Sequence, residues 1–232
     1  MLDTQDLDAW IVYIQSLNPE EMEFSLDRPH RVLARLELVD NLPFVITVAG
    51  TNGKGSCVEL LSKVFLSAGV SVGSYSSPHL IRFNERVCVN GVPATDEKLI
   101  GAFLLVEKAR QSEALTFFEY TTLAALVVFS NAGLEVLVLE AGLGGRLDVT
   151  NLIDADALLL TNIALDHIAL LGEHREKIGF EKAGLMRPRQ IVVCGDRDIP
   201  KMITDRAMDL DAQLRIIGRD FDHRNEENGW ML

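Results

Sequence analysis

The stretch Phe44-Val45-Ile46-Thr47-Val48-Ala49-Gly50-Thr51-Asn52-Gly53-Lys54-Gly55-Ser56 passes from an apolar, β-branched run into a turn with three glycines. Apolar residues at helical spacing follow it, namely Val58, Leu61, Val64, Phe65 and Ala68. This order predicts a buried strand, a glycine turn and the start of a helix. Glycines allow backbone N–H groups to close around an anion, and the helix N-terminus adds partial positive charge. The residues Gly50 to Ser56 are therefore candidate phosphate-binding residues.

The glycine turn departs from the common phosphate-binding pattern G-x-x-x-x-G-K-[ST]. Its first glycine stands three residues before Gly53, and Gly55 separates Lys54 from Ser56. Lys54 can still reach the outer phosphates of a nucleotide, and the Ser56 hydroxyl can bind Mg²⁺. The alternative is a glycine turn that only joins a strand to a helix.

The composition is that of a globular protein, with 232 residues, 48% hydrophobic and 24% charged. Its net charge of −12 argues against nucleic acid and anionic membranes as partners, because both need a basic face. An anionic small molecule is not excluded, since a helix N-terminus and Mg²⁺ can bind phosphate in an acidic protein. The simplest reason for the charge is solubility.

Cellular location is predicted from the cysteines and the N-terminus. Cys57, Cys88 and Cys194 have no spacing typical of a disulfide framework or a zinc site, so we expect partly buried, reduced thiols in a cytoplasmic protein. The acidic N-terminus lacks the basic start and apolar core of a secretory signal. The apolar run from Leu123 to Phe129 is too short to span a bilayer.

Strands and helices alternate along the chain, which predicts an α/β fold with a doubly wound, mostly parallel sheet flanked by helices. The predicted strands cover residues 44–49, 70–75, 87–89, 134–139, 157–163, 190–194 and 215–218. The predicted helices cover residues 6–17, 30–38, the segment from the glycine turn to Gly69, the segment that begins at Thr95, and residues 116–128, 173–186 and 200–210.

Polar residues follow four of these strands. They are the glycine turn, Ser77, Glu140 and the pair Asp166-His167. Ligands bind beyond the carboxyl ends of the strands in open parallel sheets, so these residues together predict a site. Singly, Ser77 could cap a turn, Glu140 could be solvated and His167 could lie in the core. Serine and glutamate oxygens suit Mg²⁺, and with a histidine present Mn²⁺ could substitute. On spacing alone, Lys182 is a surface charge on a helix.

Together these motifs resemble the folylpolyglutamate synthase/dihydrofolate synthase family of the Mur-ligase superfamily. The stretches that carry the resemblance are Gly50 to Ser56, Tyr75-Ser76-Ser77-Pro78-His79-Leu80, Arg82-Phe83-Asn84-Glu85-Arg86, Glu140-Ala141-Gly142-Leu143-Gly144-Gly145-Arg146-Leu147-Asp148, Ala164-Leu165-Asp166-His167 and Glu181-Lys182-Ala183-Gly184. The resemblance implies a P-loop ATP-binding central domain of the Mur-ligase type over residues 1–218, including the N-terminal helices at 6–38. Residues 219–232 would be a tail that leads towards a C-terminal glutamate-ligase domain.

The resemblance also implies an activity and its residues. The family uses ATP and Mg²⁺ to join L-glutamate to dihydropteroate or tetrahydrofolate through an acyl phosphate. By resemblance the catalytic residues are Lys54, His167 and Lys182, with Lys182 carbamylated by CO₂, and the metal ligands are Ser56, Ser77, Glu140, His167 and Lys182. The implied substrate-binding residues are Phe24, Pro78, His79, Arg82, Thr116, Phe117, Phe118, Glu119, Leu147, Asp148 and Val149.

The resemblance covers only the first part of the family's length. We therefore expect a monomeric fragment or natural truncation that binds nucleotide and pteroate but turns over poorly, because domain closure is missing. Three alternatives remain open. They are ligation of peptidoglycan precursors by another Mur-type enzyme, a non-catalytic binding module, and a generic P-loop kinase or GTPase, which the glycine spacing disfavours.

Overall fold

An eight-stranded sheet forms the centre of the computed structural model, which describes residues 5–18, 25–38, 42–226 and 229–231. The strands are β1 (Phe44–Ala49), β2 (Val72–Tyr75), β3 (Val87–Val89), β4 (Val92–Pro93), β5 (Val136–Glu140), β6 (Ala157–Leu160), β7 (Ile191–Cys194), β8 (Gln213–Ile216), β9 (Arg224–Glu226) and β10 (Gly229–Met231). The helices are α1 (Leu7–Leu17), α2 (Asp27–Leu36), α3 (Lys54–Ser67), α4 (Asp96–Arg110), α5 (Phe117–Ser130), α6 (Ile168–Leu171), α7 (Arg175–Ala183) and α8 (Lys201–Asp209), with short 3₁₀ helices η2 (Phe83–Arg86) and η3 (Val149–Leu152).

The strand order in the sheet is β4-β3-β2-β5-β1-β6-β7-β8. The six strands from β2 to β8 in this order run parallel, and only β3 and β4 add antiparallel pairs at one edge. Asn90 and Gly91 both have positive φ and make the turn between β3 and β4. The predicted doubly wound, mostly parallel α/β fold is confirmed.

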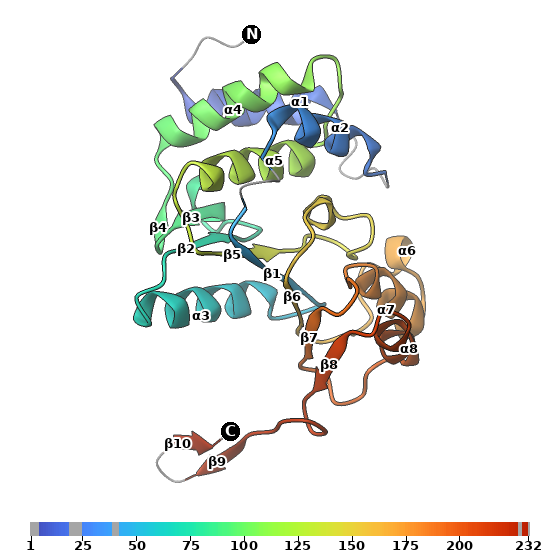
Figure 1. Cartoon of the computed structure of the whole chain (residues 1–232). Coiled ribbons are helices and arrows are strands. Elements are labelled where there is room, and N and C mark those ends of the chain that lie inside the picture. Colours follow the sequence, from blue (N-terminus) through green and yellow to red (C-terminus); the bar gives the residue numbers. More distant parts are fainter. Residues whose placement is uncertain (1–4, 19–24, 39–41, 227–228, 232) are drawn as a thin grey trace.

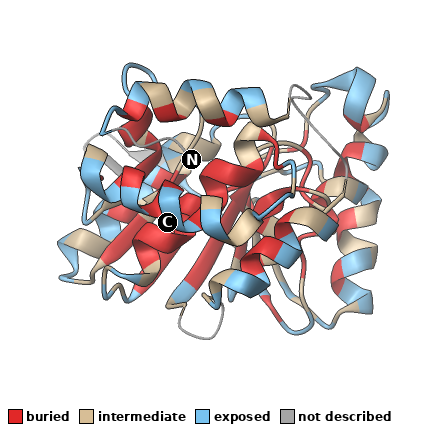
Figure 2. Cartoon of the chain, turned by 90° about the horizontal axis from the view of Figure 1, so that it is seen from above, coloured by how far each residue is buried: buried red, intermediate tan, exposed pale blue. Residues whose placement is uncertain are grey.

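Helices cover both faces of the sheet (Figure 1). The helices α1, α2, α4 and α5 lie on one side and α3 lies on the other, while α7 and α8 flank the end with β7 and β8. Trp10 of α1, Val32 of α2 and Phe103 of α4 belong to the same buried cluster as Leu137 of β5. The two N-terminal helices are therefore part of the main core. Figure 2 shows the buried residues gathered in the central strands, with exposed residues along the outer faces of the helices.

Several element boundaries differ from the predicted ones. β6 ends at Leu160 instead of residue 163, because the chain turns there to hydrogen-bond with the glycine loop. α7 is shorter than the predicted 173–186, since it ends before Gly184, and the sequence analysis missed the short α6. It also missed β9 and β10, which pair antiparallel within the predicted tail.

Two further expectations concern cysteines and membrane spans. Cys57 and Cys88 are half-buried and Cys194 is buried, all with free thiols, which agrees with the sequence analysis. Burial raises the pKa of each of these thiols. Among the helices of the described residues, none is long and apolar enough to cross a membrane.

Alanine substitutions at Gly101 of α4 and Gly73 of β2 test how closely the chain is packed at each position. A Cβ on exposed Gly101, inside α4, would meet nothing within 4 Å. Gly101→Ala should therefore raise the free energy of unfolding by about 0.5–1 kcal/mol, since glycine loses more backbone entropy in a helix. A Cβ on Gly73 of β2 would lie 2.6 Å from Leu134 Cδ1, so Gly73→Ala should destabilise. Urea unfolding of both variants measures the two signs, and equal signs would contradict this packing.

Candidate active site

Four neighbouring strands end at the same edge of the sheet. β2, β5, β1 and β6 are adjacent and parallel, so the loops that follow them meet there. These loops carry Ser77, Glu140, the glycine loop (Gly50 to Gly53) and the pair Asp166-His167. The structure confirms the prediction that these polar residues lie together at one edge of a parallel sheet.

The glycine loop is fastened to the loop after β6. Thr51 N donates to Asn162 O over 2.9 Å, and Asn52 N donates to Asn162 Oδ1 over 2.8 Å. Gly50 has a φ of +150°, and a Cβ there would lie 1.8 Å from Thr161 Oγ1. Gly53, with a φ of +82°, caps α3 without a side-chain hydrogen bond. The first turn of α3 therefore presents its backbone N–H groups at the sheet edge, as phosphate binding requires.

Two lysines meet at one carbonyl of the glycine loop. Lys54 Nζ donates to Gly50 O over 3.3 Å and to Thr51 O over 3.1 Å. Lys182 Nζ, from α7, donates to the same Gly50 O over 2.9 Å. Lys182 is only 3% exposed, so its interpretation as a surface charge is wrong. Burial, with the nearby charge of Lys54, lowers the pKa of Lys182 to about 8.

Glu140 and Ser77 lie next to each other. Glu140 is the last residue of β5 and is 3% exposed, so it is not a solvated charge. Its Oε2 accepts a hydrogen bond from Ser77 N over 3.1 Å, and a Cβ on Gly55 would lie 3.4 Å from the same oxygen. Burial raises the pKa of Glu140, while Ser77 N–H and the charges of Lys54 and Arg86 oppose the rise. Glu140 is thus a buried carboxylate beside the Ser77 backbone and the start of α3.

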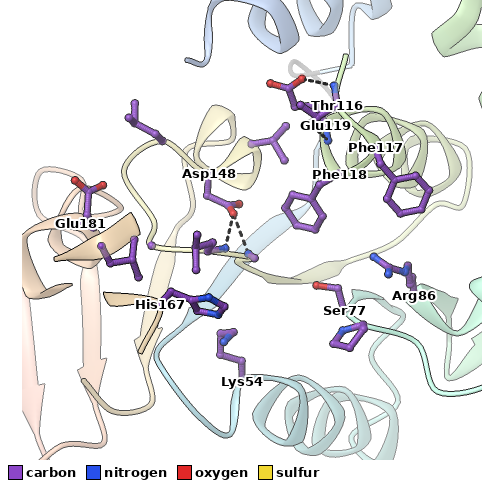
Figure 3. Close-up of a pocket in the computed structure, with 17 residues that line it drawn as sticks. Lys54, Ser77, Arg86, Thr116, Phe117, Phe118, Glu119, Asp148, His167 and Glu181 are labelled. Atoms are coloured by element: carbon purple, nitrogen blue, oxygen red, sulfur yellow. Dashed lines mark hydrogen bonds between the residues drawn. The ribbon is translucent and has the colours of Figure 1, made fainter. Parts of the chain in front are cut away.

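His167 is not a core histidine. Its side chain is 55% exposed, and its Nε2 lies 3.8 Å from Asp166 Oδ2. Its backbone has a φ of +45° at the start of α6. His167 and Lys54 both line the same cavity, and Figure 3 draws them towards the same end of it.

A cavity of about 720 Å³ opens beside these residues. Figure 3 shows Lys54, His167 and Ser77 towards one end, and Thr116 and Glu119 towards the other. Of the residues predicted to bind phosphate, metal or substrate, those that line this cavity are Lys54, Ser77, Pro78, Thr116, Phe117, Phe118, Glu119, Leu147, Asp148, Val149 and His167. The sequence analysis missed six others in the lining, namely Arg86, Gly142, Leu143, Gly144, Leu171 and Glu181.

The far end of the cavity is held by a capping box. Thr116 caps α5, and Glu119 Oε2 accepts a hydrogen bond from Thr116 N over 2.7 Å. The other oxygen of Glu119 accepts from Arg28 Nη2 of α2 over 3.0 Å. Burial raises the pKa of Glu119, and the contacts with Thr116 and Arg28 oppose the rise. The Glu119 carboxylate is thus tied to both an N-terminal helix and the cavity wall.

Asp148 ties the loop after β5 to the start of η3. Its Oδ2 accepts hydrogen bonds from Gly142 N over 2.9 Å and Leu143 N over 3.0 Å (Figure 3). Its Oδ1 accepts from Thr150 N over 2.9 Å and Thr150 Oγ1 over 2.6 Å. A Cβ on Gly142 would lie 2.7 Å from the Phe118 ring, so the two sides of the cavity are closely packed here.

Two predicted substrate-binding residues, His79 and Arg82, are not brought to this cavity, and a third, Phe24, lies outside the described residues. His79 and Arg82 instead line a second cavity of about 500 Å³ near α1. Arg82 pairs there with Asp96 over 3.0 Å, and His79 Nδ1 accepts a hydrogen bond from Arg86 Nε over 2.9 Å. The loop between β2 and η2 turns these two side chains away from the first cavity.

Charges in the first cavity are unevenly compensated. Its three acidic residues all have partners, because Glu119 pairs with Arg28, Glu181 pairs with Arg146, and Asp148 accepts from backbone N–H groups. Lys54 and Arg86 have no carboxylate partner among the described residues. The part of the cavity lined by Lys54 and Arg86 therefore favours binding of an anion, even though the whole chain is acidic.

Burial of Lys182 predicts a stability that depends on pH. The folded state lowers its pKa from 10.5 to about 8, so the unfolded chain binds the proton more tightly. Burial of the charged lysine therefore lowers the free energy of unfolding by about 1–3 kcal/mol. This loss is complete below pH 8 and decreases as the pH rises towards 10.5. Lys182→Met should thus be more stable than wild type at pH 7, with a gain that shrinks at pH 9.5. Urea unfolding at both pH values tests this, with exposed Lys177→Met as the control. A gain that does not depend on pH would contradict the account.

Comparisons with known proteins agree with this geometry. Dihydrofolate synthase/folylpolyglutamate synthase of Escherichia coli is 43% identical over 226 residues, which is 97% of this chain and 54% of that protein. A structure described as E. coli FolC in complex with DHPP and ADP has a TM-score of 0.94 at 43% identity, covering 97% of this chain and 54% of that one. A bifunctional folylpolyglutamate synthase/dihydrofolate synthase with Mn, AMPPNP and L-glutamate bound has a TM-score of 0.90 at 44% identity, with coverage of 97% and 54%.

The chain spans about half the length of the curated relatives that it matches. The family model described as the Mur ligase middle domain matches residues 48–225, from the end of β1 into β9. This match and the similarity to the two solved structures confirm the resemblance inferred from the motifs. The chain belongs to the Mur ligase middle domain family.

Proposed function

We propose that this chain carries the ATP-phosphate and pteroate sites of an amide ligase that joins L-glutamate to dihydropteroate or tetrahydrofolate. One observation carries the proposal. The glycine loop, Lys54, Ser77 and Glu140 meet at one edge of the sheet and open into a cavity with aromatic walls. The relatives described above are named for this activity, and one of them was solved with ADP and DHPP.

The chemistry requires two anions to approach each other. The carboxylate oxygen of the pteroate attacks the γ-phosphorus of ATP, ADP leaves, and an acyl phosphate results. The amine of glutamate then attacks the acyl carbon, loses a proton, and displaces inorganic phosphate. Lys54 and the first turn of α3 would hold the β- and γ-phosphates, because they supply positive charge where it is needed. Phe117 and Phe118 would hold the pterin and aryl rings and keep water from the reacting carboxylate.

The side chains present also fit a hard divalent ion. Glu140 is a buried carboxylate beside Ser77, and Ser56 is in the first turn of α3, so oxygen ligands are near one another. No group of three or more His, Cys, Asp or Glu that could hold a metal occurs in the described part of the chain. Ser56, Ser77 and Glu140 would hold one Mg²⁺ or Mn²⁺ ion and His167 a second, with phosphate oxygens and water as the remaining ligands. Such an ion neutralises phosphate charge during transfer.

Lys182 is proposed to be carbamylated. Its pKa of about 8 leaves a sizeable neutral fraction at physiological pH, and the neutral amine is the form that reacts with CO₂. The Lys182 amine is buried beside Gly50 O at the glycine loop. A carbamate there would replace a cation by an anion, which would favour binding of a metal ion near the phosphates. An unmodified, protonated Lys182 would instead repel the metal ion.

The remaining parts of the proposal concern organisation and partners. Residues 1–218 would act as one nucleotide- and pteroate-binding unit, since α1 and α2 share the main core with β1 and β5. The partners would be small molecules, with no nucleic acid or membrane, as the net charge of −12 favours. We propose a cytoplasmic monomer, in keeping with three free thiols.

Binding and turnover measurements test the proposal. Isothermal titration should give binding of Mg²⁺–AMPPNP and of dihydropteroate, and dihydropteroate should stimulate ADP formation more than UDP-linked peptidoglycan precursors do. Stimulation by the UDP-linked compounds alone would favour another Mur-type ligase. Binding of both ligands without ADP formation would favour a non-catalytic binding module, and binding of neither would overturn the proposal.

A further inference from the structure

Arg86 stands at the cavity wall in a fixed orientation. It is the last residue of η2 and is 9% exposed. Its guanidinium carbon lies 5.7 Å from the ring centroid of Phe83 and 5.6 Å from that of Phe117. Its Nε donates a hydrogen bond to His79 Nδ1 over 2.9 Å. Two ring contacts and one hydrogen bond together determine the plane of the guanidinium.

The terminal nitrogens of Arg86 are available to a ligand. Across the residues that the structure describes, neither Nη atom has a hydrogen-bond partner, and no carboxylate forms an ion pair with it. Other arginines near the two cavities differ, because Arg82 pairs with Asp96 and Arg146 pairs with Glu181. A largely buried guanidinium without a counter-ion is costly, so the arrangement suits an anion that arrives from outside.

The position of Arg86 in the cavity indicates which anion it would bind. Arg86 lines the cavity beside Ser77 and Phe117 (Figure 3), and its charge opposes the rise in the pKa of Glu140. It therefore stands between the aromatic walls and the glycine-loop end of the cavity. A pteroate whose rings lie against Phe117 and Phe118 would direct its carboxylate towards this guanidinium. Arginine can hold a carboxylate by two parallel hydrogen bonds, which also fixes its direction.

We propose that Arg86 binds the reacting carboxylate of the pteroate, and that His79 is its positioning residue. This inference rests on the proposed function, whose pteroate site it makes specific. His79 does not touch the substrate. Its Nδ1 accepts the Arg86 Nε–H, which places the imidazole proton on Nε2 and leaves both Nη groups for the ligand. His79, in the loop after β2, and Arg86, in η2, thus form one carboxylate-binding site.

The first test compares two ligands on the unaltered chain. Pteroic acid and its carboxamide have the same rings, and differ in the charge that Arg86 would bind. Wild-type protein should bind the acid about 10- to 100-fold more tightly, the range expected for a hydrogen-bonded charge pair. Arg86→Gln should remove most of this preference while it leaves the Kd of Mg²⁺–AMPPNP within about 2-fold. Arg82→Gln, outside the cavity, is the matched control and should keep the preference.

The second test addresses His79. In His79→Asn, Oδ1 can accept the Arg86 Nε–H in place of Nδ1, so the preference for the acid should stay within about 2-fold of wild type. His79→Leu removes the acceptor and should lower the preference about 3- to 10-fold, with carboxamide binding unchanged. A general structural role would weaken both ligands equally and would not be rescued by asparagine.

The outcomes separate this inference from the proposed function. If wild-type protein binds neither pteroic acid nor AMPPNP, the proposed function itself fails. If it binds both, and the acid is not preferred over the carboxamide, the role of Arg86 is overturned. The same holds if Arg86→Gln keeps the preference, or weakens AMPPNP instead of the acid.

Discussion

Lys54→Met should weaken the binding of Mg²⁺–AMPPNP about 10- to 100-fold, because a charge-assisted hydrogen bond to the outer phosphates is lost. In the structure the Lys54 ammonium is held at the glycine loop by Gly50 O and Thr51 O, so it is already at the place where the phosphates would bind. Isothermal titration measures the loss. Pteroic acid binding should change by less than about 2-fold, since the aromatic walls of the cavity are not affected.

Lys63 provides the matched control for this prediction. It is on the same helix, α3, with its side chain 70% exposed and paired with Glu59. Lys63→Met removes the same charge from the chain as Lys54→Met, so any effect of net charge alone appears in both variants. An affinity loss shared by the two variants, or absent from both, would contradict the assignment of Lys54 to the phosphates.

Asp148→Ala should have the largest effect on stability. Its carboxylate accepts four hydrogen bonds, from Gly142 N, Leu143 N, and the N and Oγ1 of Thr150. Removal leaves buried N–H groups without an acceptor, which should lower the free energy of unfolding by about 3–5 kcal/mol. Pteroic acid binding should be lost as well, because Gly142 and Leu143 line the cavity. Urea unfolding and isothermal titration measure these two effects.

Asp154 is the control for Asp148. Its side chain is 81% exposed and pairs with Arg187 near the same loop. Asp154→Ala should cost at most about 1 kcal/mol, as exposed ion pairs do. Asp148→Asn keeps one acceptor oxygen and should fall between wild type and Asp148→Ala. If Asp148→Ala were as stable as Asp154→Ala, and bound pteroic acid weakly, Asp148 would be a direct ligand instead of a support for the loops.

Periodic features of the sequence predicted the fold well. The β-branched run of β1 and the alternation of strands with helices are properties of neighbouring residues, so they can be seen without the tertiary structure. The adjacency of Ser77, Glu140 and the glycine loop followed from the rule for parallel strand ends. The short α6 and the paired strands β9 and β10 were missed, because a single helical turn and three-residue strands are too short to show a period.

The direction of loop side chains was less predictable. Residues between β2 and β3 have no regular period, so nothing in the sequence distinguished Arg82, which faces Asp96, from Arg86, which lines the cavity. Burial of Lys182 depends on how α7 packs against the glycine loop, which is a tertiary contact. One available signal was overlooked. Thr116 and Glu119 have the spacing of a capping box, which would have predicted the anchoring of Glu119, whereas the start of α5 was predicted without it.

A crystal structure with Mg²⁺, AMPPNP and pteroic acid tests the central claim most directly. We expect the γ-phosphate within hydrogen-bond distance of Lys54 Nζ, the metal ion against Ser77 and Glu140, and the pteroate rings between Phe118 and the loop held by Asp148. A nucleotide bound at another part of the chain, with Lys54 still hydrogen-bonded to Gly50 O, would contradict the account.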